Sequence, residues 1–177
     1  PSCNPYFRSI PEQEVYICFP AFVSAFNDSE WALICPLEID IYSEKYNLAI
    51  EFDGVYWHSF NSVLSEKKDY HLSKTEQCEE HGIQLLHVFE NEWAIPKKQE
   101  IWKSIIRNKF GKSKKIFARK CVIRSVDSKT TKLFLENNHL QGSSISSINY
   151  GLYYEDQLVS IMTFSKSRYD KKVDFEL

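Results

Sequence analysis

Two short segments, Leu37-Glu-Ile-Asp-Ile41 and Leu48-Ala-Ile-Glu-Phe-Asp53, decide the fold of this chain. In each of them apolar and acidic residues alternate, which is the period of a β-strand that buries one face. The polar segment Glu44-Lys-Tyr-Asn47 separates them, so we predict a β-hairpin. One face of this hairpin collects the acidic side chains Glu38, Asp40, Glu51 and Asp53.

Helical periods flank the hairpin on both sides, and an apolar strand follows it. Ser9-x-x-Glu12 is typical of a capping box, and Gly82 suits the position just after a helix. The expected elements are helices over Ser9–Phe26, Ser65–His81 and Lys97–Phe110, and a strand over Ile83–Phe89 that is buried on both faces. This order predicts an α/β domain with a mixed central sheet flanked by helices.

A polar, basic stretch, Lys112-Ser-Lys-Lys115, indicates a linker, so we expect one domain over 1–111 and a second unit over 112–177. The second unit is predicted to be a small, partial α+β domain. Its expected elements are a strand over Phe117–Ile123, a helix over Ser128–Asn137 and a hairpin, Ile148–Tyr154 with Leu158–Phe164, that turns at Glu155-Asp156.

Composition favours an ordinary globular protein: 43% of the 177 residues are hydrophobic and 26% are charged. No apolar run reaches the roughly 18 residues of a membrane span. The five cysteines are scattered and include no C-x-x-C pair, which argues against a disulfide framework and against a zinc site. We therefore expect a cytoplasmic protein in which most cysteines are small buried hydrophobes.

The charge is strongly asymmetric. Between Ala94 and Lys132 there are 13 Lys or Arg residues against two acids. Such a block favours contact with the phosphates of double-stranded DNA, although a solvated basic helix and linker is the plain alternative. The residues predicted to bind DNA are Lys97, Lys98, Lys103, Arg107, Lys112, Lys114, Lys115, Arg119 and Lys120.

Several carboxylates on one sheet face repel one another unless a cation neutralises them. Hard oxygen ligands favour Mg²⁺ or Mn²⁺ over zinc, and a metal beside a basic surface suggests phosphodiester hydrolysis. His58 is a candidate general base or acid. The alternatives are a solvated sheet face and an ordinary hydrogen-bonded histidine. His71, Lys74 and His87 are expected to be structural. The alternative is that the helix after the hairpin packs so that Asp69, His71 and Lys74 lie at the same sheet edge as the acidic residues.

The segment Phe52-Asp-Gly-Val-Tyr-Trp-His58, followed by Gly82-Ile-Gln-Leu-Leu-His-Val-Phe-Glu90, resembles the Vsr-like endonucleases and the EDxHD phage homing endonucleases. These belong to the PD-(D/E)xK superfamily, so the resemblance implies a restriction-endonuclease-like core over 1–111. It also implies a metal-dependent, site-specific endodeoxyribonuclease that acts in a phage-infected host cell.

The resemblance also implies roles for single residues. Asp40 matches the central metal ligand, Glu51 the acidic member of the motif, and His58 the catalytic histidine. Asp53 stands where many relatives carry the motif's lysine, which leaves the proton-transfer scheme open. The implied catalytic set is Asp40, Glu51, Asp53, His58, Asp69 and Glu12, with Glu14 as a rival to Glu12, and the implied metal ligands are Asp40, Glu51 and Asp53.

The second unit resembles the beginning of a GNAT-like acetyltransferase domain, through Phe134-Leu-Glu-Asn-Asn-His-Leu-Gln-Gly142 and the hairpin after it. No acyl-CoA loop is visible, so we expect this unit to help hold DNA. Two other functions remain open: an inactive DNA-binding module, and the targeting domain of a modification enzyme. Cutting both strands requires two active sites or two visits, so a homodimer is one expectation.

Overall fold

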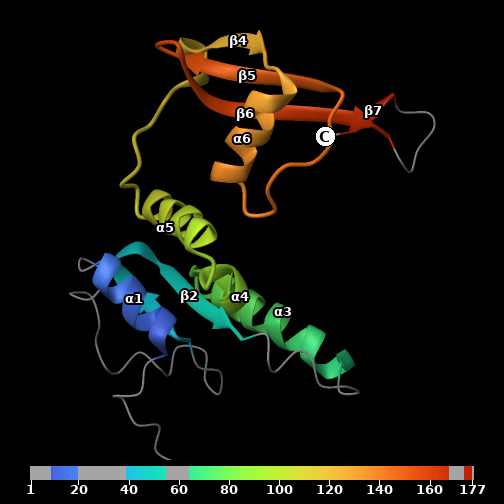
Figure 1. Cartoon of the computed structure of the whole chain (residues 1–177). Coiled ribbons are helices and arrows are strands. Elements are labelled where there is room, and N and C mark those ends of the chain that lie inside the picture. The colour runs from blue at the N-terminus through green and yellow to red at the C-terminus, as the bar shows by residue number, and fades with distance from the viewer. Residues whose placement is uncertain (1–8, 20–38, 55–63, 168–173, 177) are drawn as a thin grey trace, which may run out of the picture. The chain divides into compact units, whose positions relative to one another are not determined.

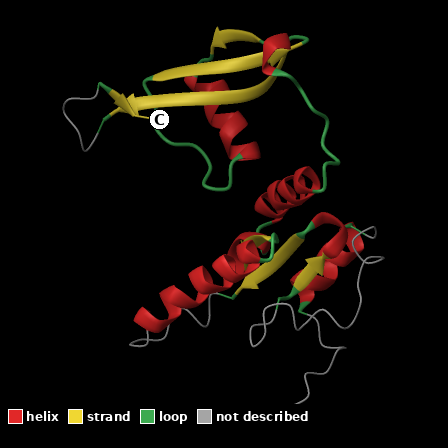
Figure 2. Cartoon of the chain, turned by 180° about the vertical axis from the view of Figure 1, so that it is seen from behind, coloured by secondary structure: helices red, strands yellow, loops and turns green. Residues whose placement is uncertain are grey.

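The computed structural model describes residues 9–19, 39–54, 64–167 and 174–176 of the chain. The chain divides into two compact units, Pro1–Gly111 and Lys112–Leu177 (Figure 1). Each unit contains both helices and strands, as the colouring in Figure 2 shows, so the protein is of the α/β class. In the described part of the chain, no helix has both the length and the apolar character needed to cross a membrane.

The first unit is built on a mixed sheet of three strands in the order β1-β2-β3. β1 (Ile41–Ser43) pairs antiparallel with β2 (Leu48–Asp53), and β3 (Gln84–Phe89) lies parallel to β2. A 3-10 helix over Glu44–Tyr46 and the left-handed residue Asn47 connect β1 to β2. The predicted hairpin and the mixed character of the sheet are both confirmed.

The first strand of the hairpin is displaced from its predicted position. The alternating pattern predicts a strand over Leu37–Ile41, but β1 begins at Ile41, and Asp40 lies in a bend before it. The side-chain Oδ2 of Asp40 accepts a hydrogen bond of 2.7 Å from the backbone N–H of Phe52, a bond that a strand would make with a backbone carbonyl. Glu38, predicted to share the acidic face, lies outside the described residues.

α1 (Ile10–Cys18) begins with the predicted capping box, in which Ser9 and Glu12 exchange hydrogen bonds between side chain and backbone. The helix predicted to continue to Phe26 ends at Cys18, and residues 20–38 lie outside the described part. Pro20 explains this end, because a residue that precedes proline is disfavoured in the helical region. Phe19 accordingly adopts φ −133° and ψ 67°.

α3 (Leu64–Glu80) packs against one face of the sheet. Its Cys78 belongs to a buried cluster formed with Tyr42, Ala49 and Ile83. The helix ends as predicted at Gly82, whose φ of +72° is a conformation that glycine adopts at little cost.

The side chain of Phe52 lies on the opposite face of the sheet, and α4 (Glu90–Trp93) packs there. The ring centroids of Phe52 and Trp93 are 5.4 Å apart. α5 (Pro96–Lys109) follows directly, within one residue of its predicted bounds. The sheet of the first unit therefore has helices on both faces, and its buried core includes Val15, Ile41, Leu48, Ile50, Val88 and Ile106.

One expectation about burial is wrong, and the expectation that most cysteines are buried is tested at three of the five. β3 was predicted to be buried on both faces, but only Val88 is fully buried and Phe89 is 47% exposed, because its end opens onto a cavity beside α3. Of the three described cysteines, Cys78 alone is buried, whereas Cys18 is exposed and all three are free thiols. Cys18 ends α1 on its solvent side, so helix position rather than hydrophobicity decides its exposure.

The second unit is an antiparallel sheet in the order β4-β5-β6-β7 with one helix, α6. The hairpin turns at Glu155 and Asp156, both with positive φ, as a two-residue turn requires. The strand predicted over Phe117–Ile123 is wrong in position: a 3-10 helix occupies Ala118–Lys120 and the strand starts after it. The bounds are β4 Val122–Ser125, α6 Ser128–Asn138, β5 Ile148–Tyr154, β6 Gln157–Lys166 and β7 Phe175–Glu176.

Candidate functional site

The acidic face of β2 lies against α3. The spacing of side chains along the strand and along the helix brings oppositely charged groups together. Glu51 and Asp53 share one face of β2, because side chains alternate along a strand. His71 and Lys74 share one face of α3, because residues three apart lie one above the other on a helix. Lys74 consequently reaches Glu51, and His71 reaches Asp53.

Asp40 and Glu51 form a carboxylate pair across the hairpin. The register that pairs Ile41 with Ile50 places Asp40 beside Glu51 at the end of the ladder. Burial and the negative charge of Glu51 raise the pKa of Asp40 to about 7. The carboxylate of Glu12 adds to this rise, whereas the Phe52 N–H and the ammonium of Lys74 oppose it. It is therefore energetically unfavourable for both carboxylates of the pair to be ionised at once.

Lys74 supplies positive charge to this pair. Its side chain is buried, with 1% of the residue exposed, and Nζ lies 2.5 Å from Oε1 of Glu51. A buried ammonium is tolerated only with such a partner. The other oxygen, Oε2 of Glu51, is buried and accepts no hydrogen bond from any described residue. Among the described residues, this oxygen is the buried acceptor of the pair that a ligand could use.

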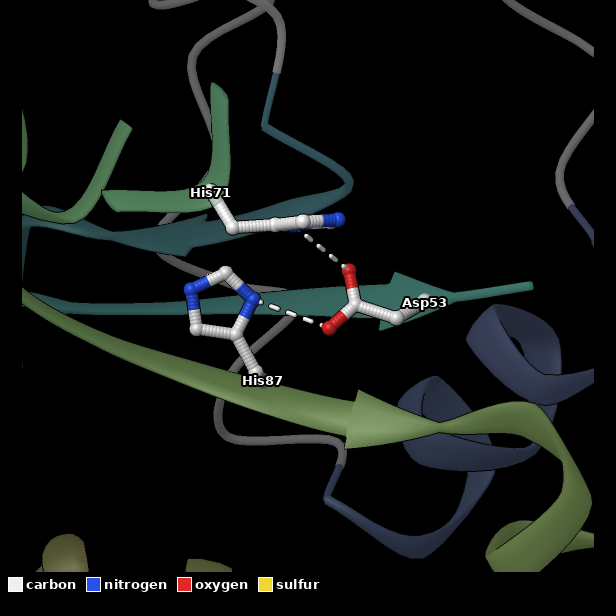
Figure 3. Close-up of side chains that lie close together, drawn as sticks. All are labelled: Asp53, His71 and His87. Carbon is white, nitrogen blue, oxygen red and sulfur yellow. Dashed lines mark hydrogen bonds and ion pairs between the residues drawn. The ribbon is translucent and has the colours of Figure 1, made fainter. Parts of the chain in front are cut away.

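Asp53 belongs to a second cluster. Its Oδ2 lies 3.0 Å from Nδ1 of His87 on β3, and its Oδ1 lies 3.4 Å from Nδ1 of His71 on α3. Figure 3 shows that the two rings approach different oxygens of the one carboxylate. On its far side, Nε2 of His87 lies 3.0 Å from Oγ1 of Thr75. The three residues predicted as metal ligands thus fall into two neighbouring groups, Asp40 with Glu51 and Asp53 with two histidines.

The structure distinguishes the two candidate glutamates of α1. Glu14 accepts hydrogen bonds of 2.7 Å from both Trp93 Nε1 and Gln99 Nε2, so it attaches α1 to α4 and α5. Glu12 is the one whose charge acts on Asp40, although its Oε1 also serves the capping box. Glu12 is therefore the better candidate for the site, and Glu14 has a structural role.

Two predicted catalytic residues cannot be placed at atomic detail. His58 lies outside the described residues. Asp69 lies within α3, two positions before His71, and its side chain is outside the described part.

The predicted DNA-binding residues of α5 are not equivalent. Lys98 pairs with Glu92 and Lys103 pairs with Glu100, at 3.6 and 2.8 Å. Lys97 and Arg107 are exposed and form no ion pair with a described residue. The residues predicted in the second unit, all exposed, are Lys112, Lys114, Lys115, Arg119 and Lys120.

Lys74, His71 and His87, which were expected to be structural, contact the acidic face of β2. The signal that identifies them is the match of two patterns: His71, Lys74 and Cys78 recur at helical spacing, and Ala49, Glu51 and Asp53 recur at strand spacing. Once α3 is known to cover this face of β2, the pairs follow. The sequence does not say which face α3 covers.

Comparison of the chain with protein-family models, with curated proteins and with solved structures found no significant match.

Proposed function

We propose that this protein is a divalent-metal-dependent DNA endonuclease with a restriction-endonuclease-like, PD-(D/E)xK core, and that Asp40, Glu51 and Lys74 form its reactive centre. The observation that carries the proposal is the contact of a buried ammonium with one oxygen of a carboxylate pair whose other buried oxygen, Oε2 of Glu51, has no described partner. Two acids and one lysine are the residue types of that motif.

The position of Lys74 accounts for the departure of this chain from the motif. Asp53 stands where the lysine of the motif is expected, two residues after Glu51. Lys74 delivers its ammonium to Glu51 from the facing helix instead. In this proposal Lys74 therefore supplies the positive charge that the motif's lysine would supply. The mixed sheet with helices on both faces is of the general α/β class.

The donor set fits a hard divalent cation, Mg²⁺ or Mn²⁺. Asp40 and Glu51 offer carboxylate oxygens, and Oε2 of Glu51 is a buried acceptor with no described hydrogen-bond donor. The high pKa of Asp40 has the same origin, since two acids compete for one poorly solvated space. When bound, the cation supplies Lewis-acid polarisation of the scissile phosphate.

The residues of the chain have separate tasks in this proposal. The Phe52 N–H orients the carboxylate of Asp40 through Oδ2. Lys74 holds a positive charge where negative charge develops on the phosphate. Glu12 adds negative charge beside Asp40 and strengthens the demand for a cation. His58 and Asp69 remain proposed proton-transfer residues, by their resemblance to the EDxHD group.

Double-stranded DNA is the proposed substrate, cut at a specific site as in the phage homing endonucleases. Lys97 and Arg107 are exposed cations of α5 that form no ion pair with a described residue and suit phosphate contacts, and the basic residues after Gly111 extend them along the chain. Phosphate contacts position DNA but do not read its sequence.

The test is cleavage of supercoiled plasmid with Mg²⁺ and with EDTA, by the native chain and by the variants Asp40→Asn, Glu51→Gln, Lys74→Met and His58→Ala. We expect metal-dependent nicking or linearisation that each variant lowers at least about 100-fold. The matched control is Lys45→Met, an exposed lysine of the first unit outside the basic block, which should leave cleavage unchanged. Full activity in Asp40→Asn and Lys74→Met would refute the proposed centre, and tight binding without cleavage would favour an inactive module.

A further inference from the structure

We propose that Asp53, His71 and His87 form a binding site for a divalent transition-metal ion of the zinc class, distinct from the oxygen-rich pair of Asp40 and Glu51. This site goes beyond the nuclease proposal and does not depend on it. Among the described residues, these three are the group of histidine and acidic side chains whose ligand atoms all lie within 4.8 Å of one another (Figure 3).

The distances suit an ion held between the three side chains. In a tetrahedral site with ligands at about 2.0–2.1 Å from zinc, two ligand atoms lie about 3.4 Å apart. The observed separations from the Asp53 oxygens are 3.4 Å to Nδ1 of His71 and 3.0 Å to Nδ1 of His87. The two imidazole rings are nearly perpendicular, with centroids 5.5 Å apart, so they point at a common space without stacking.

The hydrogen bonds of Thr75 show which ring nitrogen of His87 carries a proton. The hydroxyl of Thr75 donates its one proton to the carbonyl of His71, at 2.9 Å. Its oxygen can therefore only accept from Nε2 of His87, 3.0 Å away, which places a proton on Nε2. In a neutral His87 the lone pair is then on Nδ1 and faces the carboxylate of Asp53. Such an arrangement of two acceptors needs either a second proton or a metal ion between them.

The hydrogen bond from His87 to Thr75 is also the kind of outer contact that metal-binding histidines require. A ligating histidine normally donates its other ring N–H to an oxygen, which fixes the ring and the tautomer. Thr75 stands one turn after His71 on α3, so the same helix supplies one ligand and the support of another. The three ligands lie on β2, α3 and β3 and none lies on a loop. Regular elements hold side chains more precisely than loops do.

Access and charge permit an ion here. A cavity of about 530 Å³ lies over the cluster and is lined by Asp53, His71, Leu72, Thr75, His87 and Phe89. It leaves room for water or another ligand as the fourth partner. Asp53 is only 5% exposed, so its charge calls for a counterion. Among the described residues of α3, Lys74 is paired with Glu51.

The donor set selects the class of metal. Two imidazole nitrogens and one carboxylate suit Zn²⁺, Co²⁺ and related ions, whereas Mg²⁺ prefers oxygen ligands alone. The two neighbouring sites should therefore differ in preference, with hard ions at Asp40 and Glu51 and imidazole-binding ions at Asp53. The rival state without metal is a carboxylate flanked by protonated histidine, and the test separates the two.

The experiment titrates the full, metal-stripped chain with Zn²⁺ and with Co²⁺ near pH 7.5, without DNA, by calorimetry and by visible absorption of Co²⁺. We expect one ion per chain with a four- or five-coordinate cobalt spectrum, unaffected by Asp40→Asn and by excess Mg²⁺. His71→Asn and His87→Asn should each weaken Zn²⁺ by more than about 100-fold, and Thr75→Val by about 10- to 100-fold.

The matched control is His81→Asn, at the residue that follows α3, where Nδ1 lies 2.8 Å from the carbonyl oxygen of Gln77. Circular dichroism checks that each variant is folded. If a variant does not fold, the stoichiometry and cobalt spectrum of the native chain still decide the matter. Zn²⁺ binding to the native chain that is no tighter than to folded His71→Asn or His87→Asn would overturn the proposal, as would a six-coordinate cobalt spectrum. Because no cleavage is measured, failure of the nuclease proposal leaves this result intact.

Discussion

Nζ of Lys74 lies 2.5 Å from Oε1 of Glu51, although 23 positions and a helix–strand boundary separate the two residues in the chain. The ammonium is almost completely buried, and its partner's second oxygen has no described donor. A buried ion pair contributes little net stability compared with apolar residues of the same volume. Its position beside a second carboxylate, Asp40, is the arrangement on which the proposed reactive centre rests.

Lys74→Met should separate stability from activity. Removing the ammonium leaves Glu51 buried and uncompensated, which costs about 3–5 kcal/mol of unfolding free energy. The double variant Lys74→Met, Glu51→Gln should recover much of that stability, because no buried charge remains, yet stay inactive. Urea unfolding and plasmid cleavage measure the two effects. Equal stability of the single and double variants would contradict the assigned pair.

The stability of the metal-free protein should fall as the pH rises from about 4 to about 7. Burial and Glu51 raise the folded-state pKa of Asp40 to about 7, above its ordinary value of 3.8, so the folded state binds more protons than the unfolded state between these limits. The change is at most about 4 kcal/mol. Unfolding in EDTA at several pH values measures it.

Asp40→Asn is the control for this pH dependence, because the amide does not titrate. The difference in unfolding free energy between the native chain and Asp40→Asn should grow through the same pH window and level off above it. Mg²⁺ should reduce the difference, since a bound cation favours the carboxylate. A difference that stays constant with pH would show that Asp40 does not titrate in this range.

Glu12 and Glu14 should respond in opposite ways to substitution. Glu14→Ala removes the acceptor of two hydrogen bonds to a carboxylate, each worth about 1.5–3 kcal/mol, so α1 should loosen and the protein should be clearly destabilised. Glu12→Gln preserves an acceptor for the capping box and should cost under about 1 kcal/mol. Its effect should instead be on metal-dependent cleavage. Thermal unfolding and plasmid assays compare the two, and equal stabilities would argue against the anchoring role of Glu14.

DNA affinity should fall steeply with salt, and the exposed cations of α5 should account for part of the slope. Lys97→Ala and Arg107→Ala should each reduce the magnitude of the log–log slope by about 0.9, the value for one neutralised phosphate. Lys103→Ala should change it less, because that ammonium is paired with Glu100. Fluorescence anisotropy with a DNA duplex at several salt concentrations gives the slopes, and a flat salt response in the native chain would exclude phosphate-driven binding.

Local pattern was sufficient for several elements. The capping box at Ser9, the helix end at Gly82, helix α5 and the turn at Glu155 and Asp156 all lie where the sequence predicts them. Each depends on interactions between residues a few positions apart, which are visible in a short segment. The elements that were predicted wrongly depend on contacts with residues distant in the sequence, or on one residue that outweighs the local pattern. Asp40 leaves the strand because its side chain bonds to Phe52, twelve residues away, and α1 ends early at Pro20.

The sequence by itself determined the types of group available to this protein: alternating acids on two strands, a helix that carries His71 and Lys74, and a basic block after Trp93. Only the tertiary structure decided which of them meet. The face of β2 that α3 covers, and the parallel pairing that sets His87 beside Glu51 and near Asp53, divide the acids into one pair with a lysine and one acid with two histidines. The reason is physical, because the ion pairs and hydrogen bonds of these groups form at distances of 2.5–3.4 Å. Separation along the chain does not determine such distances, which are set only when the helices pack on the sheet.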